Sequence, residues 1–342
     1  MWASSLGLPV NQLLCGDAKT VISSFPDDSI DLSMTSPPYW GLRDYKVDGQ
    51  IGLEETPYNY IEKLVDLYRE IKRVLKPSGS IYIVVGDTYF GTGYGVPQTI
   101  SGKQRDLPNF TIKQKYVNNW LRPKQKLLIP DRLFIALQED GWLLRNKIIW
   151  NKPNPMPESC DDRYSQSYEE IGFFTKSEDY FFDMKAVLKP LKKSTIVRSQ
   201  SPYYKEKKSG YRIGVEGHLK LASKYKDINI ESNGRTSRKG IEGKDEIPID
   251  LGGRHPRDVW SITTRSYHNA HFAVYPEELV EECVKASSPK NGIVLDPMMG
   301  SGTTCLVAWR LGRNFIGVDI KQEYVDIANK RLNGCINQKR LL

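Results

Sequence analysis

The chain has 342 residues, of which 39% are hydrophobic and 26% charged, and its formal net charge is +8. This composition is typical of a globular protein, and no run approaches the ~18 apolar residues of a membrane helix, so we expect a soluble protein. No signal sequence begins the chain and its five cysteines include no Cys-x-x-Cys pair, so we expect a cytoplasmic protein with reduced cysteines and no metal site.

The first part of the chain alternates between apolar strands and a helix. Residues 11–15 and 30–34 are short apolar runs that end in turn-forming residues. Apolar residues at helical spacing predict a helix over 60–75, which Lys76-Pro77-Ser78-Gly79 ends, and residues 80–86 predict the next strand. This order predicts an α/β fold with a mainly parallel sheet, in which ligands bind at the carboxyl ends of the strands.

The middle of the chain is less regular. Glycine, Asn, Gln and basic residues accumulate over about 89–128 and predict an inserted basic loop. A helix near 131–139 and a strand over 143–150 follow, and then a proline-rich connection over 151–157 leads to a strand at 170–175.

The positive charge is concentrated in one segment. Residues 189–244 hold 15 Lys or Arg against 5 Asp or Glu, a net charge of +10 that leaves −2 for the rest of the chain. Lys and Arg that neutralise phosphates release condensed counterions, so this segment favours a polyanionic partner, although a solvated basic loop would have the same composition. We expect an inserted target-recognition region over 189–257.

The last part of the chain is regular again. Helices are predicted over 276–287, 303–311 and 323–331, and strands over 292–295 and 315–318. These elements form a complete βαβ unit with a glycine-rich turn before its helix.

That glycine-rich turn indicates a nucleoside cofactor. It runs from Asp296 through Gly300 and Gly302, and Asp319 ends the next strand 23 residues after Asp296. Glycines let a ligand approach the backbone over the helix N-terminus, and an acid at about this distance suits a ribose diol. The turn lacks the Gly-Lys-Ser/Thr of a phosphate loop, and Asp296 would repel a pyrophosphate. A cationic ligand such as S-adenosylmethionine is therefore favoured over ATP or a dinucleotide.

A second motif follows the strand at 30–34. Thr35-Ser36-Pro37-Pro38-Tyr39 places two adjacent prolines, which hold the backbone rigid and donate no amide hydrogen, directly before an aromatic ring. Alone, these residues would be an ordinary turn. Together with the glycine-rich turn, they indicate a catalytic site.

The two motifs together resemble those of the DNA amino-methyltransferases. Ser36-Pro37-Pro38-Tyr39 is similar to the Ser-Pro-Pro-Tyr signature common among N4-cytosine enzymes, whereas N6-adenine enzymes more often begin with Asp or Asn. The catalytic motif precedes the cofactor motif, as in the circularly permuted β group. The resemblance implies a Rossmann-like α/β fold of the S-adenosylmethionine-dependent methyltransferases, circularly permuted, with an inserted basic DNA-recognition region.

The resemblance also implies roles for individual residues. Ser36, Pro37, Pro38 and Tyr39 are the expected catalytic residues. Cofactor binding is implied for Asp17, Thr35, Phe272, Pro276, Asp296, Gly300, Gly302, Thr303, Thr304 and Asp319. Residues 148–154 resemble the strand and turn near the flipped base. In the basic region, the candidate guanine contacts are Arg198, Arg212, Arg235 and Arg238.

The chemistry of an exocyclic amine is consistent with these roles. Its lone pair is delocalised into the ring, and acceptors at Ser36 Oγ and the Pro37 carbonyl can localise it as the methyl group approaches. The target must be flipped out of the duplex, and Tyr39 offers a flat face for stacking. A C5-cytosine enzyme would need a cysteine nucleophile, usually after a proline, and the chain contains no Pro-Cys pair.

The sequence therefore predicts a site-specific N4-cytosine methyltransferase of duplex DNA. Residues 1–188 would form the catalytic part, 189–257 the recognition insert and 258–342 the cofactor-binding part. An N6-adenine enzyme of the same architecture and, more remotely, a non-catalytic nucleic-acid-binding protein are the alternatives. Expected partners are double-stranded DNA and a cognate restriction endonuclease, whereas the sequence leaves open whether the protein is a monomer or a homodimer.

Overall fold

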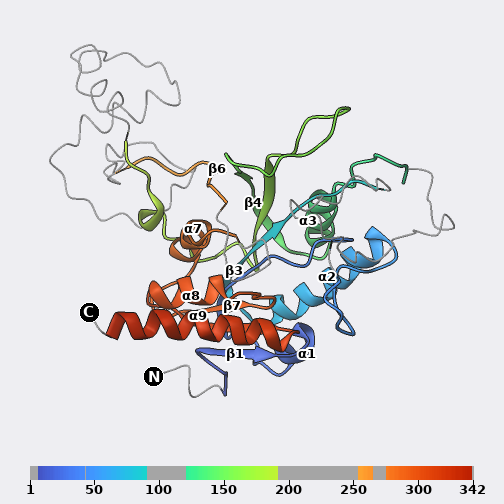
Figure 1. Cartoon of the computed structure of the whole chain (residues 1–342). Helices are drawn as coiled ribbons and strands as arrows, with labels where there is room; N and C mark the ends of the chain where they lie inside the picture. The colour runs from blue at the N-terminus through green and yellow to red at the C-terminus, as the bar shows by residue number, and fades with distance from the viewer. Residues whose placement is uncertain (1–6, 43, 91–120, 192–252, 265–274, 341–342) are drawn as a thin grey trace, which may run out of the picture. The chain divides into compact units, whose positions relative to one another are not determined.

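The structure is a computed structural model that describes residues 7–42, 44–90, 121–191, 253–264 and 275–340 (Figure 1). Its contacts divide the chain into two compact units, one of residues 1–182 and 258–342, the other of residues 183–257. Of the second unit, the structure describes a short helix, η3 (Lys185–Val187), and a bridge between Lys189 and Arg254. Phe272 and the four arginines expected to contact DNA, Arg198, Arg212, Arg235 and Arg238, lie outside the described residues.

A single sheet organises the first unit. Its strand order is β1-β8-β7-β2-β3-β5-β4-β6. The strands are β1 (Gln12–Cys15), β2 (Ile30–Thr35), β3 (Leu75–Val85), β4 (Leu143–Asn151), β5 (Tyr168–Thr175), β6 (Val259–Ser261), β7 (Ile293–Asp296) and β8 (Asn314–Asp319). Strands β1, β8, β7, β2 and β3 pair in parallel, whereas β5 runs antiparallel between β3 and β4. The predicted α/β fold with a mainly parallel sheet is confirmed.

Helices cover both faces of the sheet because its central strands bury side chains on both sides. In β3, Ile81, Ile83 and Val85 belong to one hydrophobic cluster, and Tyr82 and Val84 belong to the other. The first cluster includes residues of α1 (Ala18–Ser23), α2 (Pro57–Val74) and α3 (Ile129–Glu139). The second includes residues of α7 (Glu277–Ser287), α8 (Thr303–Arg310) and α9 (Gln322–Arg340), which lie close together in Figure 1.

Three local features differ from the sequence prediction. Strand β3 begins at Leu75 rather than at residue 80, because residues 76–79 form an irregular start to the strand, marked by a register shift against β2. Helix α9 continues to Arg340, well beyond its predicted end at residue 331. Helix α1 and strand β6 were not predicted, since segments of six and three residues carry too little periodicity to be recognised.

Two properties of the described residues bear on function. None of their helices is long and apolar enough to cross a membrane. Within the same residues, His, Cys, Asp and Glu side chains form no group that could hold a metal ion.

Candidate functional site

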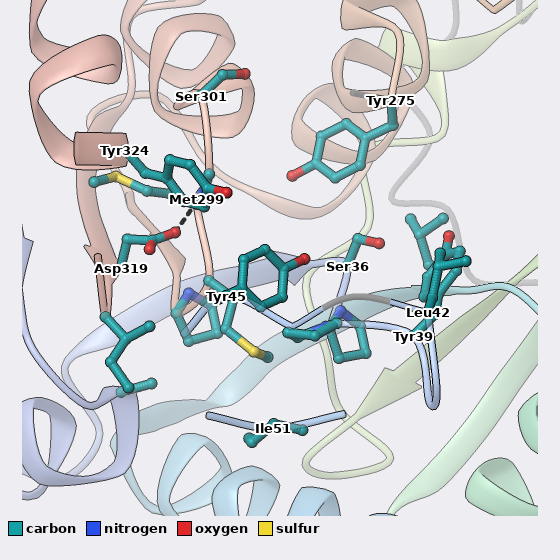
Figure 2. A pocket seen from close by; sticks show the side chains of 18 of the residues that line it. Ser36, Tyr39, Leu42, Tyr45, Ile51, Tyr275, Met299, Ser301, Asp319 and Tyr324 are labelled. Carbon is teal, nitrogen blue, oxygen red and sulfur yellow. Dashed lines mark hydrogen bonds between the residues drawn. The ribbon is translucent and has the colours of Figure 1, made fainter. Parts of the chain in front are cut away.

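A pocket of about 270 Å³ lies at the carboxyl ends of the parallel strands. Asp17, Ser36, Pro297 and Ile320 line it, and they follow β1, β2, β7 and β8, respectively, by one or two residues. Figure 2 shows Asp319, Tyr324 and Met299 on one side of this pocket and Ser36 and Tyr39 on the other. The topology of the sheet therefore brings the two predicted motifs to one cavity, although they are far apart in the sequence.

Packing fixes the Ser-Pro-Pro-Tyr segment from several sides. The hydroxyl of Tyr60, a buried residue of α2, donates to the Pro38 carbonyl oxygen over 2.9 Å. A Cβ atom at Gly86, just after β3, would lie 2.4 Å from Cε2 of the Tyr39 ring, so only glycine leaves room for the ring there. At Gly52, where φ is +108°, a Cβ would lie 3.3 Å from the Pro38 side chain. The loop at the end of β2 is therefore held as a rigid unit.

The Tyr39 hydroxyl belongs to a chain of polar contacts. It donates to Oε2 of Glu169 over 2.8 Å, and the Ser36 side chain lies in the same pocket. The other Glu169 oxygen, Oε1, accepts from Nζ of Lys152, and this ammonium lies 4.5 Å from the centroid of the Trp150 ring. Burial, and then the charge of Glu169, raises the pKa of Tyr39 well above its usual value, so its hydroxyl stays protonated. All five side chains line the pocket.

The glycine-rich turn and Asp319 form the opposite wall of the pocket. Oδ2 of Asp319 accepts from the backbone N–H of Gly300, and Oδ1 accepts from that of Lys321, both over 2.9 Å. Burial raises the pKa of Asp319. Gly300 and Gly302 have φ values of +50° and +75°, which favour glycine, and Gly302 precedes the first residue of α8. The carboxylate of β8 thus fixes the turn between β7 and α8.

Behind this wall, Asp296 is completely buried and hydrogen bonded. The Tyr275 hydroxyl lies 3.0 Å from Oδ2 of Asp296 and also contacts the Thr304 hydroxyl. Oδ1 of Asp296 accepts from the backbone N–H of Met298 over 3.2 Å. Burial raises the pKa of Asp296 to about 6. Tyr275 and Met298 line the pocket whereas Asp296 does not, so the carboxylate contacts the pocket only through these two residues.

The predicted site residues that the structure describes either line the pocket or lie outside its lining. Those that line the pocket are Asp17, Ser36, Pro37, Pro38, Tyr39, Gly300, Thr303 and Asp319. Thr35, Pro276, Asp296, Gly302 and Thr304 are not among the lining residues. Thr35 ends β2 completely buried, and its hydroxyl has no hydrogen-bond partner among the described residues.

The sequence did not identify several residues of this pocket. Glu169 lies at the start of β5, where no motif surrounds it. Tyr45 and Tyr324 make an edge-to-face contact with ring centroids 6.0 Å apart, but they come from a loop near the N-terminus and from α9. Lys152 and Trp150 belong to a segment that was expected near the site, although neither was assigned a role. Only the folded structure shows that these side chains converge on one pocket.

Comparisons with known proteins agree with this geometry. The sequence pattern of a family described as DNA methylase matches residues 30–330. The type II methyltransferase M.Cfr9I of Citrobacter freundii is 36% identical over 321 residues, covering 93% of this chain and 86% of that protein. The type II methyltransferase M.SmaI of Serratia marcescens is 33% identical, covering 94% and 90%.

Solved structures resemble the fold at lower sequence identity. PvuII DNA methyltransferase (cytosine-N4-specific) is 18% identical, with a TM-score of 0.56 over 93% of this chain and 84% of that one. TTHA0409 of Thermus thermophilus, complexed with S-adenosyl-L-methionine, is 22% identical, with a TM-score of 0.54 over 94% and 93%. These likenesses show that the chain shares the fold of these two proteins.

Proposed function

Because this chain belongs to the family of N6-adenine and N4-cytosine DNA methylases, we propose that it methylates N4 of cytosine in duplex DNA, within a restriction-modification system. The general activity, transfer of a methyl group from S-adenosylmethionine to DNA without regard to the base, follows from the family and the fold. The choice of base rests on one observation. The first residue of the pocket motif is Ser36, a hydroxyl where N6-adenine enzymes more often have Asp or Asn.

The residues at one end of the pocket fit the cofactor. A Cβ atom at Gly300 would meet nothing within 4 Å, so the backbone of the turn is open to a ligand. We assign the ribose hydroxyls to Asp319, since each carboxylate oxygen can accept a further hydrogen bond. Met298, Ile320 and Tyr324 offer an apolar wall for the adenine. S-adenosylmethionine, when bound, supplies a methyl group that is electrophilic because it is attached to a sulfonium.

The other end of the pocket would bind the flipped base. We assign acceptance of the exocyclic amine hydrogens to Ser36 Oγ and the Pro37 carbonyl, which localises the nitrogen lone pair for attack. The Tyr39 ring would stack on the base, and its position against Gly86 is fixed before the base arrives. The side chains that hold this loop stay fixed during the reaction, so catalysis comes mainly from positioning.

DNA binding and chain order complete the proposal. The basic region 189–257 would contact phosphates, and Arg198, Arg212, Arg235 and Arg238 would read guanines in the major groove. The Ser-Pro-Pro-Tyr segment follows β2 and the glycine turn follows β7, an order that supports membership of the permuted β group. A cognate restriction endonuclease would cut the same sequence when it is unmethylated.

A direct assay tests the activity and the choice of base together. The protein is incubated with S-adenosylmethionine carrying a deuterated methyl group and with unmethylated genomic DNA, which is then digested to nucleosides for mass spectrometry. We expect deuterated N4-methylcytosine. Deuterated N6-methyladenine would refute the cytosine assignment, and the absence of any labelled base would refute DNA methylation. A parallel reaction with the Ser36→Ala protein controls for contaminating enzymes.

A further inference from the structure

We propose that Glu169 takes up the proton that the methylated amine must release, through a relay formed by the Ser36 and Tyr39 hydroxyls. This inference rests on the proposed function, and it holds for cytosine and adenine alike because both present an exocyclic amine. It gives a role to a carboxylate that lies in the pocket but belongs to neither sequence motif.

Methyl transfer leaves one proton too many on the nitrogen. The nitrogen lone pair forms the new N–C bond, the S–C bond breaks, and its electron pair neutralises the sulfonium. The amine nitrogen then carries the methyl group, two hydrogens and a positive charge. One of these hydrogens must leave as a proton, and a positioned base accelerates such steps.

The hydrogen bond from Tyr39 to Glu169 can carry this proton on its last step. The Tyr39 hydroxyl donates to Glu169 over 2.8 Å, and the Ser36 hydroxyl lies in the same pocket. In the proposed relay, Ser36 donates to the Tyr39 oxygen once the base is bound. A hydroxyl has one hydrogen to donate and lone pairs to accept with, so Ser36 can bond to Tyr39 and still accept from the amine. Shifting one proton along each bond moves a proton from the amine to Ser36, from Ser36 to Tyr39, and from Tyr39 to Glu169. The two hydroxyls are restored and Glu169 becomes a neutral carboxylic acid.

The raised pKa of Tyr39 is consistent with a relay. Because the Tyr39 hydroxyl keeps its hydrogen, it is not an ionised base that could take up the proton and hold it. It can only accept one proton while it gives up its own. The chain therefore needs an acceptor at its far end, and Glu169 occupies that end.

Lys152 pairs with this acceptor. Its ammonium pairs with the Glu169 oxygen that Tyr39 does not use, and the two side chains are only 19% and 17% exposed. The Trp150 ring beneath the ammonium holds the lysine in place through a cation–π contact.

The other two carboxylates that line the described pocket are engaged elsewhere. Asp17 accepts from the N–H and the hydroxyl of Thr20 at the start of α1. Asp319 accepts from two backbone N–H groups on the cofactor side. Among the described lining carboxylates, Glu169 is the one bonded to the tyrosine of the motif.

Single-turnover kinetics on methylatable DNA test the relay. Glu169→Gln keeps an oxygen that can accept from Tyr39 but is not a base, so we expect the rate to fall about 100-fold with unchanged cofactor affinity. Tyr39→Phe keeps the ring and breaks the relay, so it should cause a similar fall. Since the two residues act as a unit, the double variant should be no slower than either single variant.

Chemical rescue separates proton uptake from simple positioning of the ring. Glu169→Ala leaves a space beside Lys152 that formate can enter, and formate should restore its rate in proportion to concentration, whereas chloride at equal ionic strength should not. Tyr39→Phe should not respond to formate. Glu170→Gln is the matched control, because Glu170 is the next residue of β5 and is also paired with a lysine, Lys147, but does not line the pocket. It should keep the normal rate.

Each outcome is decisive. If the unaltered protein methylates no DNA, the proposed function fails. If that protein is active and Glu169→Gln reacts at the normal rate, the relay is wrong and the proposed function stands. A slow Glu169→Gln together with no formate rescue of Glu169→Ala would also overturn the relay, because Glu169 would then act only by holding Tyr39.

Discussion

Replacing Asp296 with Asn should stabilise the protein at neutral pH more than at acidic pH, relative to the unaltered chain. Asp296 is completely buried, and burial raises its pKa from 3.8 to about 6. Between these two values the folded state binds more protons than the unfolded state, so the free energy of unfolding falls as the pH rises through this window. At about 1.4 kcal/mol per pH unit, the ionised carboxylate costs the fold about 3 kcal/mol above pH 6.

Asn removes this cost because it carries no charge and still offers an oxygen to the Tyr275 hydroxyl. Urea unfolding of both proteins between pH 4 and pH 7.5 measures the difference directly. The Asn variant should gain up to about 3 kcal/mol relative to the unaltered chain across the window, and gain nothing further above it. Using the difference between the two proteins removes the contribution of every other titrating group. A difference that does not change with pH would refute the raised pKa of Asp296.

Three further predictions concern the pocket itself. Ser36→Ala should lower single-turnover methylation roughly 100-fold while isothermal titration shows an unchanged affinity for S-adenosylmethionine, and full activity would remove the role of its hydroxyl. Gly86→Ala should lower turnover by at least about tenfold, because its Cβ would lie 2.4 Å from the Tyr39 ring; a crystal structure with the ring undisplaced would contradict this. Asp319→Ala should weaken S-adenosylmethionine binding by about tenfold or more in the same titration, with Asp326→Ala, an exposed change on α9, as the control.

Local patterns were sufficient to predict most of the fold. Apolar runs and helical spacing located β2, α2, α8 and β8 to within a few residues, because each is long enough to show its period. Residues 76–79 were misread as a simple turn, since Pro77 and Gly79 do favour one. Only the pairing of β3 with β2 shows that the strand already begins at Leu75.

The sequence also predicted only part of the candidate site. Residues grouped in a motif could be assigned from the sequence, as Ser36 and Asp319 were, and both line the pocket. Asp296 was also assigned, but its side chain points into the core and contacts Tyr275 rather than the pocket. Whether a carboxylate faces a cavity or the core depends on packing, which a motif does not contain.

Glu169 shows how topology creates a site that no motif reveals. Because β5 runs antiparallel to β3, its first residues lie beside the last residues of β3, with Glu170 paired to Val85. Strand β4 runs antiparallel to β5 in turn, so its end, with Trp150 opposite Glu169, reaches the same edge of the sheet. This edge is where Tyr39 lies after β2. A strand that joined the sheet in parallel at this position would have placed its amino end on the opposite side, far from the tyrosine. The reversed strand therefore supplies the carboxylate that the Ser-Pro-Pro-Tyr motif itself lacks.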